Sequence, residues 1–170
     1  MLVNRDQEFE AFVRKSRARL LRVATNLTAG DPHLAEDLVQ TTLVRLYVAW
    51  PRVRRTHVDA YATRTLVNSL IDQSRRPYVR RERPLDRLPE RATAVTERED
   101  DADTDVLDAL GTLPPRMRTA VVLRHVEGFS LKEAADAMNC GVGNVKSQAS
   151  RGLDKIRAAL SQRGETRCTT

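Results

Sequence analysis

The stretch Phe129–Ile156, FSLKEAADAMNCGVGNVKSQASRGLDKI, contains two helical patterns separated by a short break. In the first pattern, Ser130 is followed three residues later by Glu133, which is the spacing of a capping box that satisfies the unpaired amides of a helix start. The string NCG at 139–141 supplies the break, and a second apolar stripe with helical spacing follows it. The stretch therefore predicts a helix-turn-helix pair.

The second helix of this pair carries polar and basic side chains opposite its apolar stripe. These side chains are Asn144, Lys146, Ser147, Ser150 and Arg151. Short polar donors and cations on one face suit a helix that lies in the major groove of DNA. An ordinary helical hairpin with a solvated face shows the same pattern, so this stretch alone leaves both interpretations open.

Composition limits the class of protein. The 170 residues are 41% hydrophobic and 31% charged, which is typical of a globular protein with one domain or two small ones. Aromatic residues make up only 4%, which favours packed helices, and the net charge of +6 favours a polyanionic partner. No apolar run approaches the ~20 residues that span a bilayer, and the N-terminus is too charged for a signal peptide. We therefore expect a cytoplasmic protein without membrane insertion.

The residues that usually carry catalysis or bind metals form no recognisable pattern. Cys140 and Cys168 lack the spacing of a disulfide framework or a metal site. The three histidines are scattered, and no glycine-rich phosphate loop is present. The sequence thus predicts no enzyme activity, no metal and no cofactor.

Charge along the chain divides it into two modules. Arginine predominates over residues 52–91, acidic residues over 97–108, and lysine and arginine again over 112–163. Pro77, Pro84 and Pro89 interrupt any helical pattern within the last part of the first basic block. We expect an N-terminal module over 5–76, a flexible acidic linker over 77–103, a C-terminal module over 104–160 and a disordered tail over 161–170.

Apolar periodicity predicts an all-α fold with three helices in the first module and four in the second. The N-terminal helices are expected at about 6–28, 32–50 and 59–76, with Pro51 ending the second. The C-terminal module should place helices at about 104–113 and 115–127 before the helix-turn-helix pair. The outer face of the third N-terminal helix forms a polar ridge of Arg64, Asn68, Asp72, Arg75 and Arg76.

The order of short motifs resembles one family. The motifs are AEDLVQ at 35–40, DAY at 59–61, VN at 67–68, LP at 113–114, GFS at 128–130 and VGNVKS at 142–147. In this order and spacing they resemble the extracytoplasmic-function (ECF) class of RNA polymerase sigma factors, within the sigma-70 superfamily. The DAY and VN motifs are most similar to those of a short actinobacterial-type subgroup. The resemblance implies that the two modules are sigma regions 2 and 4.

The same resemblance implies a function and its surfaces. Such a factor binds core RNA polymerase through the β′ clamp helices and the β flap, directs it to promoters and helps to open the strands. Its partners would be core polymerase, promoter DNA in duplex and single-stranded form, and an anti-sigma factor. The polymerase-binding residues would be Glu36, Asp37, Gln40 and Thr41. The minus-ten residues would be His57, Val58, Asp59, Arg64, Asn68, Arg75 and Arg76. The minus-thirty-five residues would be Arg124, Lys132, Asn144, Lys146, Ser147, Ser150 and Arg151, with Arg124 and Lys132 as phosphate contacts.

Two other functions remain compatible with the residues alone. One is a helix-turn-helix regulator that binds DNA without polymerase, and the other is a protein that only sequesters a partner. Three positions also depart from the family pattern: Gln148 replaces a usual arginine, Ala149 replaces a larger apolar residue, and Gly152 replaces a usual alanine. Since a glycine inside a helix costs about 1 kcal/mol relative to alanine, Gly152 predicts a less stable recognition helix.

Overall fold

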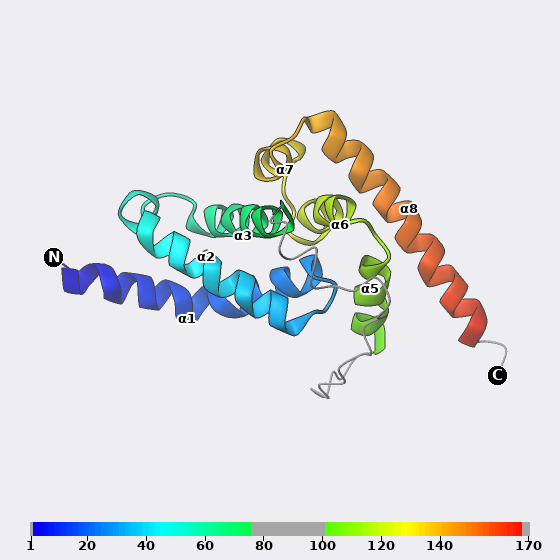
Figure 1. The fold of residues 1–170 in the computed structure, drawn as a ribbon, viewed down its shortest axis with the longest axis horizontal. Coiled ribbons are helices and arrows are strands. Elements are labelled where there is room, and N and C mark those ends of the chain that lie inside the picture. The colour runs from blue at the N-terminus through cyan, green and yellow to red at the C-terminus, as the bar shows by residue number, and fades with distance from the viewer. Residues whose placement is uncertain (1, 76–100, 168–170) are drawn as a thin grey trace.

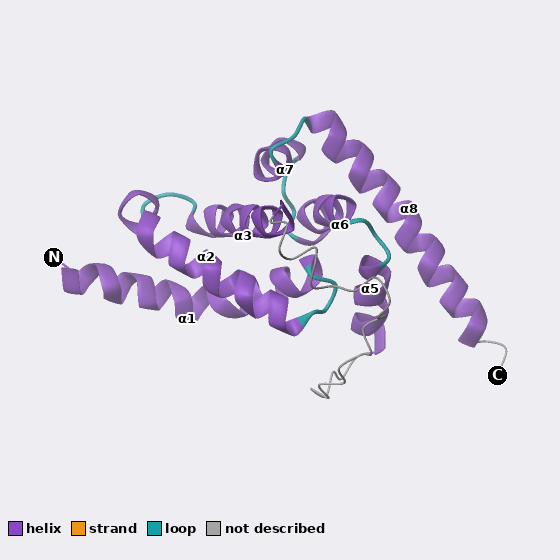
Figure 2. Ribbon diagram, viewed as in Figure 1, coloured by secondary structure: helices purple, strands orange, loops and turns teal. Residues whose placement is uncertain are grey.

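The computed structural model describes residues 2–75 and 101–167, and side chains over 4–74 and 103–162. Within these ranges every regular element is a helix (Figure 2), which confirms the predicted all-α class. Most of the expected linker lies outside the described residues. Figure 1 shows that the helices form two groups, one from each end of the chain, which lie against each other.

The N-terminal module consists of three long helices around a leucine-rich core. They are α1 (Leu2–Leu27), α2 (Pro32–Val53) and α3 (Val58–Arg75). All three helices contribute side chains with no exposed surface, namely Leu20, Leu38, Leu46 and Leu66. The helices begin and end close to the predicted positions, because the apolar residues at helical spacing do face the core.

The turn between α1 and α2 is stabilised by a side-chain cap at the start of α2. Ala29 and Gly30 have φ angles of 54° and 88°, which reverse the chain after α1. The carboxylate of Asp31 then accepts a hydrogen bond from the amide of Leu34 at 3.0 Å, and Pro32 takes the first helical position. This turn brings α1 and α2 side by side.

Pro51 does not end the second helix, contrary to the sequence prediction. It lies inside α2, which continues to Val53. Proline removes the amide that would bond to the carbonyl of Tyr47, four residues earlier. The guanidinium of Arg5 on α1 donates to that carbonyl at 2.9 Å and also lies over the Tyr47 ring, 4.5 Å from its centroid. The partner from α1 offsets the lost bond, so the helix can continue.

The C-terminal module contains a short helix, a longer broken one, and the predicted helix-turn-helix pair. Its elements are α5 (Asp101–Gly111), α6 (Pro115–Val121), η1 (Val122–Val126), α7 (Leu131–Met138) and α8 (Val142–Arg167). The sequence predicts one α-helix from 115 to 127. The structure instead has a π-helical turn in η1, where the amide of Glu127 bonds to the carbonyl of Val122 at 2.9 Å.

The last helix extends further than the sequence predicts. We expected a tail after residue 160, but α8 continues to Arg167, and residues 168–170 lie outside the described part. Gly152 lies buried in this helix where it crosses α6. A Cβ atom at this position would stand 2.4 Å from a methyl group of Val121 and 3.1 Å from Met117. The glycine therefore permits the close approach of the two helices.

The two modules share one hydrophobic core. Buried residues of both, from Leu20 in α1 to Ala149 in α8, form a single continuous cluster. Contact occurs between α3 and α7, and between α1 and the group α5, α6 and η1. Gly111 at the end of α5 lies close to Ala29 in the turn after α1. In this structure the modules are thus packed together.

Candidate functional site

The outward face of α2 carries the residues expected to bind polymerase. Asp37 and Gln40 are exposed, and Thr41 is half-buried. Asp37 accepts a hydrogen bond from the side-chain amide of Gln73 on α3 at 2.7 Å. Glu36 is half-buried and pairs with Arg17 of α1 at 2.9 Å. The four residues therefore lie on one solvent-facing surface, with the two carboxylates anchored to different neighbouring helices.

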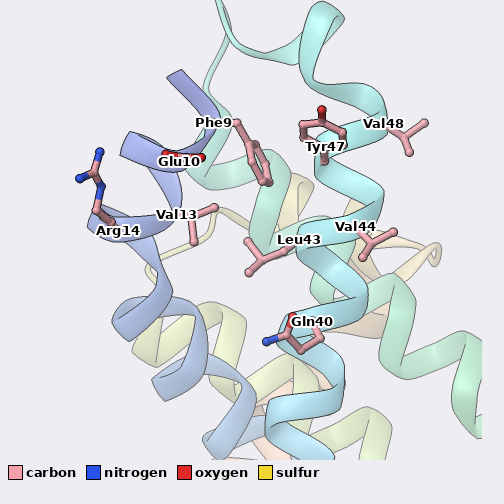
Figure 3. Close-up of a pocket in the computed structure, with 9 residues that line it drawn as sticks. All are labelled: Phe9, Glu10, Val13, Arg14, Gln40, Leu43, Val44, Tyr47 and Val48. Atoms are coloured by element: carbon pink, nitrogen blue, oxygen red, sulfur yellow. The ribbon is translucent and has the colours of Figure 1, made fainter. Parts of the chain in front are cut away.

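An apolar groove continues this surface toward the end of α2. It has a volume of about 570 Å³ and lies between α1 and α2 (Figure 3). Its apolar lining consists of Phe9, Val13, Leu43, Val44, Tyr47 and Val48, and its polar lining of Glu10, Arg14 and Gln40. Gln40 thus belongs both to the predicted polymerase-binding set and to the groove.

Two valines on the outer side of α2 are unusually exposed. Val44 and Val48 are 65% and 67% exposed, and Figure 3 shows both side chains on α2, on the side away from α1. Together with Gln40 they follow one line along the helix, because residues four apart share a face. Sequence reasoning missed them, although two valines at this spacing next to a polar face are a readable signal. An exposed apolar stripe beside polar groups is typical of a protein-binding surface.

Tyr47 is held at the edge of this groove. Its hydroxyl donates to the carboxylate of Asp6 at 2.7 Å, and this hydrogen bond raises the pKa of Tyr47 above its usual value. Its ring packs edge-on against Phe9, with centroids 5.1 Å apart. Tyr47 is 38% exposed. The ring is therefore a fixed wall of the groove.

The predicted minus-ten residues divide into two sets on α3 and the loop before it. His57 and Asn68 are exposed, and Arg64 is half-buried. Asp59 is also exposed but lies beside α1, where it accepts from Ser16 at 3.3 Å and pairs with Arg19 at 3.4 Å. Val58 packs partly against the core. Asp59 and Val58 therefore position α3, while His57, Arg64 and Asn68 remain at the surface.

The acidic member of the polar ridge on α3 is paired with a cation of α2. Asp72, next to Asn68 on the ridge, forms an ion pair with Arg45 of α2 at 3.0 Å. Arg75 is the last residue of α3, and Arg76 lies outside the described residues. The described part of the ridge therefore presents Arg64, Asn68 and a neutralised Asp72.

The helix-turn-helix pair has the predicted capping geometry. The hydroxyl of Ser130 accepts from the amide of Glu133 at 3.1 Å, and the carboxylate of Glu133 accepts from the amide of Ser130 at 2.9 Å. These hydrogen bonds, with smaller contributions from the nearby charges of Arg64 and His57, lower the pKa of Glu133. Asn139 ends α7 in the left-handed region with φ 50°. The turn therefore sets the direction of α8.

The first half of α8 exposes every residue predicted to contact the minus-thirty-five element from this helix. These are Asn144, Lys146, Ser147, Ser150 and Arg151. Asn144, Ser147 and Arg151 share one side, whereas Lys146 and Ser150 line a hollow of about 370 Å³ with Arg124, His125 and Arg157. Arg124 donates to the backbone carbonyl of Phe129, so its guanidinium also stabilises the turn before α7. Lys132 is exposed on α7.

The described residues show neither a metal cluster nor a membrane helix. Across 2–75 and 101–167, no three His, Cys, Asp or Glu side chains come together as metal ligands. No helix in the same ranges has both the length and the apolar character that crossing a bilayer requires.

Comparison with known proteins matches both modules to one superfamily. Residues 12–82 match the sigma-70 region 2 family, and residues 103–156 match the family of sigma-70, region 4. The RNA polymerase sigma-E factor of Streptomyces avermitilis is 39% identical, over 92% of this chain and 87% of that protein. The ECF RNA polymerase sigma factor SigE of Mycolicibacterium smegmatis is 29% identical, over 91% of this chain and 62% of that protein.

A solved structure has the same fold. The sigma factor RpoE of Bartonella quintana, in complex with the anti-sigma factor NepR, covers 91% of this chain and 98% of its own length, with a TM-score of 0.69 and 23% identity. The described helices, the helix-turn-helix geometry and the identity to the Streptomyces protein agree on one assignment. The chain belongs to the ECF family of RNA polymerase sigma factors, the initiation factors that bind core polymerase and direct it to promoters.

Proposed function

We propose that three surfaces of this chain have separate roles in transcription initiation. The outer face of α2 binds core polymerase, the exposed side of α3 engages the minus-ten element, and the first half of α8 reads the minus-thirty-five element. The exposed Val44–Val48 stripe beside Gln40 is the observation that best supports this proposal. It marks a protein-binding face on the helix that the family motif assigns to polymerase.

The chemistry of α2 suits a basic, partly apolar helical partner. Asp37 supplies a carboxylate, Gln40 an amide, and the two valines supply an apolar strip on the same face. A hydrogen bond to a charged group contributes about 1.5–3 kcal/mol when it is well formed. Burial of the two valines in the complex adds about 25 cal/mol of binding free energy per Å² of apolar surface. This combination fits the β′ clamp helices as the partner.

The geometry of α8 suits direct reading of a duplex. Asn144 and Arg151 lie seven residues apart, which is about 10.5 Å along a helix axis. The major groove is about 12 Å wide and admits one helix. Amide, hydroxyl and guanidinium groups can then reach base edges, with Arg124 and Lys132 as phosphate contacts.

We infer further that the chain is a non-catalytic subunit of the cytoplasm. Core polymerase supplies the nucleotidyl-transfer chemistry, and the bacterial cytoplasm is where core polymerase acts. Family membership also leads us to propose an anti-sigma factor as a regulator of this chain. A regulator that binds DNA without polymerase is not favoured, because such a protein has no need of the exposed α2 stripe.

Replacing the α8 side chains that are proposed to contact bases should impair promoter recognition and leave polymerase binding unchanged. Replacing Arg151 with alanine is expected to lower promoter-specific initiation about tenfold or more, since a bidentate base contact is worth about 1–3 kcal/mol. Ser147→Ala should have a smaller effect in the same direction. Initiation is measured by run-off transcription, and binding to core enzyme by fluorescence anisotropy. If Arg151→Ala instead weakened binding to core enzyme, the Arg151 side chain would have a structural role and would not be a base contact.

A further inference from the structure

The hollow beside α8 gathers basic side chains from two segments that are separate in the sequence. It has a volume of about 370 Å³ and lies between the end of η1, the start of α7 and one flank of α8. Its polar lining consists of Arg124, His125, Lys146, Ser150 and Arg157, and its apolar lining of Leu131, Ala149 and Leu153. Among the described residues no carboxylate lines this hollow. Cations around a small concave space, with no acidic side chain between them, attract an anion.

The backbone of η1 brings two consecutive residues to the hollow. The bond from the amide of Glu127 to the carbonyl of Val122, at 2.9 Å, closes a π turn, which holds one residue more than an α-helical turn. Arg124 and His125, both within this turn, line the hollow side by side. Single π turns inside helices frequently occur at functional sites. The irregular turn therefore supports a binding role for the hollow.

Most of the hydrogen-bonding capacity at the hollow is free for a ligand. The Nη1 atom of Arg124 donates to the backbone carbonyl of Phe129, and this is the one hydrogen bond of that guanidinium within the described residues. A guanidinium has five N–H donors, so others remain. His125, Lys146 and Ser150 are exposed, and each can donate a hydrogen bond to an anion.

The α8 residues of the hollow form one stripe along the helix. Lys146 and Ser150 are four residues apart and Arg157 follows seven residues later, so the three share a flank that is about 16 Å long. Successive residues of a helix turn by about 100°. Ser150 therefore lies about 100° around the helix from Arg151, and Lys146 lies as far from Ser147. The stripe is thus beside the proposed base-reading face and not part of it.

A helix in the major groove has its sides against the phosphate backbones. A helix with its side chains is about 10–12 Å in diameter, and the groove is about 12 Å wide. When Ser147 and Arg151 face the bases, a flank turned by about 100° faces one wall of the groove. That wall consists of phosphates, which ammonium, guanidinium and hydroxyl groups contact.

We propose that this hollow is a phosphate-binding site for the backbone of duplex DNA, in which His125 and Arg157 hold the strand together with Arg124, Lys146 and Ser150. This inference rests on the proposed function of α8. It assigns Lys146 and Ser150 to the backbone, where they fix the position of the helix in the groove without reading sequence. The charges of the hollow and of the strand are complementary.

One carboxylate of α8 competes with the strand for Arg157. Asp154 accepts a hydrogen bond from the Nη1 of Arg157 at 3.3 Å, and the two side chains are 70% and 72% exposed. An ion pair this exposed contributes little free energy, so a phosphate can displace the carboxylate. Asp154→Asn should therefore bind duplex DNA about twofold more tightly than the wild type. Weaker binding by Asp154→Asn would contradict a phosphate at Arg157.

The salt dependence of duplex binding tests the site without requiring a known promoter. The full chain is titrated against a fluorescein-labelled duplex of random sequence, about 20 base pairs or two helical turns long, at about 50–200 mM salt. Each phosphate contact contributes about 0.9 to the slope of log Kd against log salt concentration. Arg157→Ala should lower the slope by this amount and weaken binding about fivefold at about 100 mM salt. Arg157→Lys, which keeps the charge, should keep the slope.

Arg116→Ala is the matched control. Arg116 is an exposed arginine on α6 that does not line the hollow, so its replacement removes the same charge elsewhere in the module. Salt screens charges beyond about 10 Å, and Arg116→Ala should therefore keep the wild-type slope. A wild-type slope for Arg157→Ala would overturn the proposal. Equal losses in Arg157→Ala and Arg116→Ala would also overturn it, because the effect would then be one of net charge.

A second readout distinguishes a phosphate contact from a base contact. On a duplex carrying a promoter found by run-off transcription with this chain, Arg157→Ala should lose the same factor in affinity as on the random duplex. Arg151→Ala should lose more on the promoter duplex. A loss for Arg157→Ala that is confined to the promoter duplex would contradict the phosphate site.

The phosphate site and the proposed function fail in different measurements. If the chain directs no initiation but Arg157→Ala still lowers the salt slope, the proposed function ends and the phosphate site stands. If initiation is normal and Arg157→Ala keeps the wild-type slope, the phosphate site alone ends. Circular dichroism checks that each variant retains the helix content of the wild type.

Discussion

Replacing Val48 with lysine is expected to weaken binding to core RNA polymerase about 30-fold, which corresponds to the ~2 kcal/mol of an interface hot spot. Val48 is 67% exposed in the free chain, so lysine should not disturb its fold. In the complex the charge would have to be buried against the polymerase or would keep the surfaces apart. Val44→Lys should act in the same way, and Asp37→Lys should act by charge repulsion.

The control for this prediction is another exposed valine. Val106 on α5 is 43% exposed and lies outside the α2 surface, so Val106→Lys should bind core enzyme as the wild type does. Affinity is measured by titrating labelled protein with core enzyme, and the fold is checked by urea unfolding followed through Trp50 emission. Wild-type affinity in both Val44→Lys and Val48→Lys would show that polymerase binds elsewhere.

Replacing Gly152 with alanine is expected to destabilise the protein, although alanine favours helices. The gain in helix propensity is about 1 kcal/mol. Against it, the added methyl would meet Val121 at 2.4 Å and Met117 at 3.1 Å in a packed core. Overpacking of this kind costs about 1–3 kcal/mol, and a β-branched valine on a helix has few rotamers that would relieve it. We expect a net loss of about 1 kcal/mol, and a larger loss for Gly152→Val.

Gly143 provides the matched control within the same helix. Nothing lies within 4 Å of a Cβ at this position. Gly143→Ala should therefore gain propensity without a clash and raise stability, by up to about 1 kcal/mol. Chemical denaturation followed by circular dichroism gives both values. A lower free energy of unfolding for Gly152→Ala together with a higher one for Gly143→Ala would support the packing role of Gly152. A stabilising Gly152→Ala would refute it.

Local signals made much of the fold predictable from sequence. The capping box of Ser130 and Glu133 depends on residues three apart, and it appears with the expected hydrogen bonds. Apolar periodicity located seven helical segments, because each must bury one face. The predicted surfaces of α2 and α8 are exposed for the same reason.

The failures of prediction come from contacts between distant residues and from one irregular backbone turn. Pro51 reads as a helix end, but Arg5, far away in the sequence, satisfies the carbonyl that the proline leaves free. The π turn of η1 arises from backbone bonding that leaves no side-chain pattern. Arg19 and Glu127 are separated by most of the chain, so their pairing and the contact between modules are invisible in the sequence. The cost assigned to Gly152 reverses once its neighbours are known.

Transcription on a genomic DNA library with sigma-free core enzyme most directly tests whether this chain starts transcription. With the chain added, we predict RNAs with defined 5′ ends that share upstream sequence elements, and these ends should be lost with Val48→Lys. RNA whose 5′ ends match those from core enzyme alone would contradict the account.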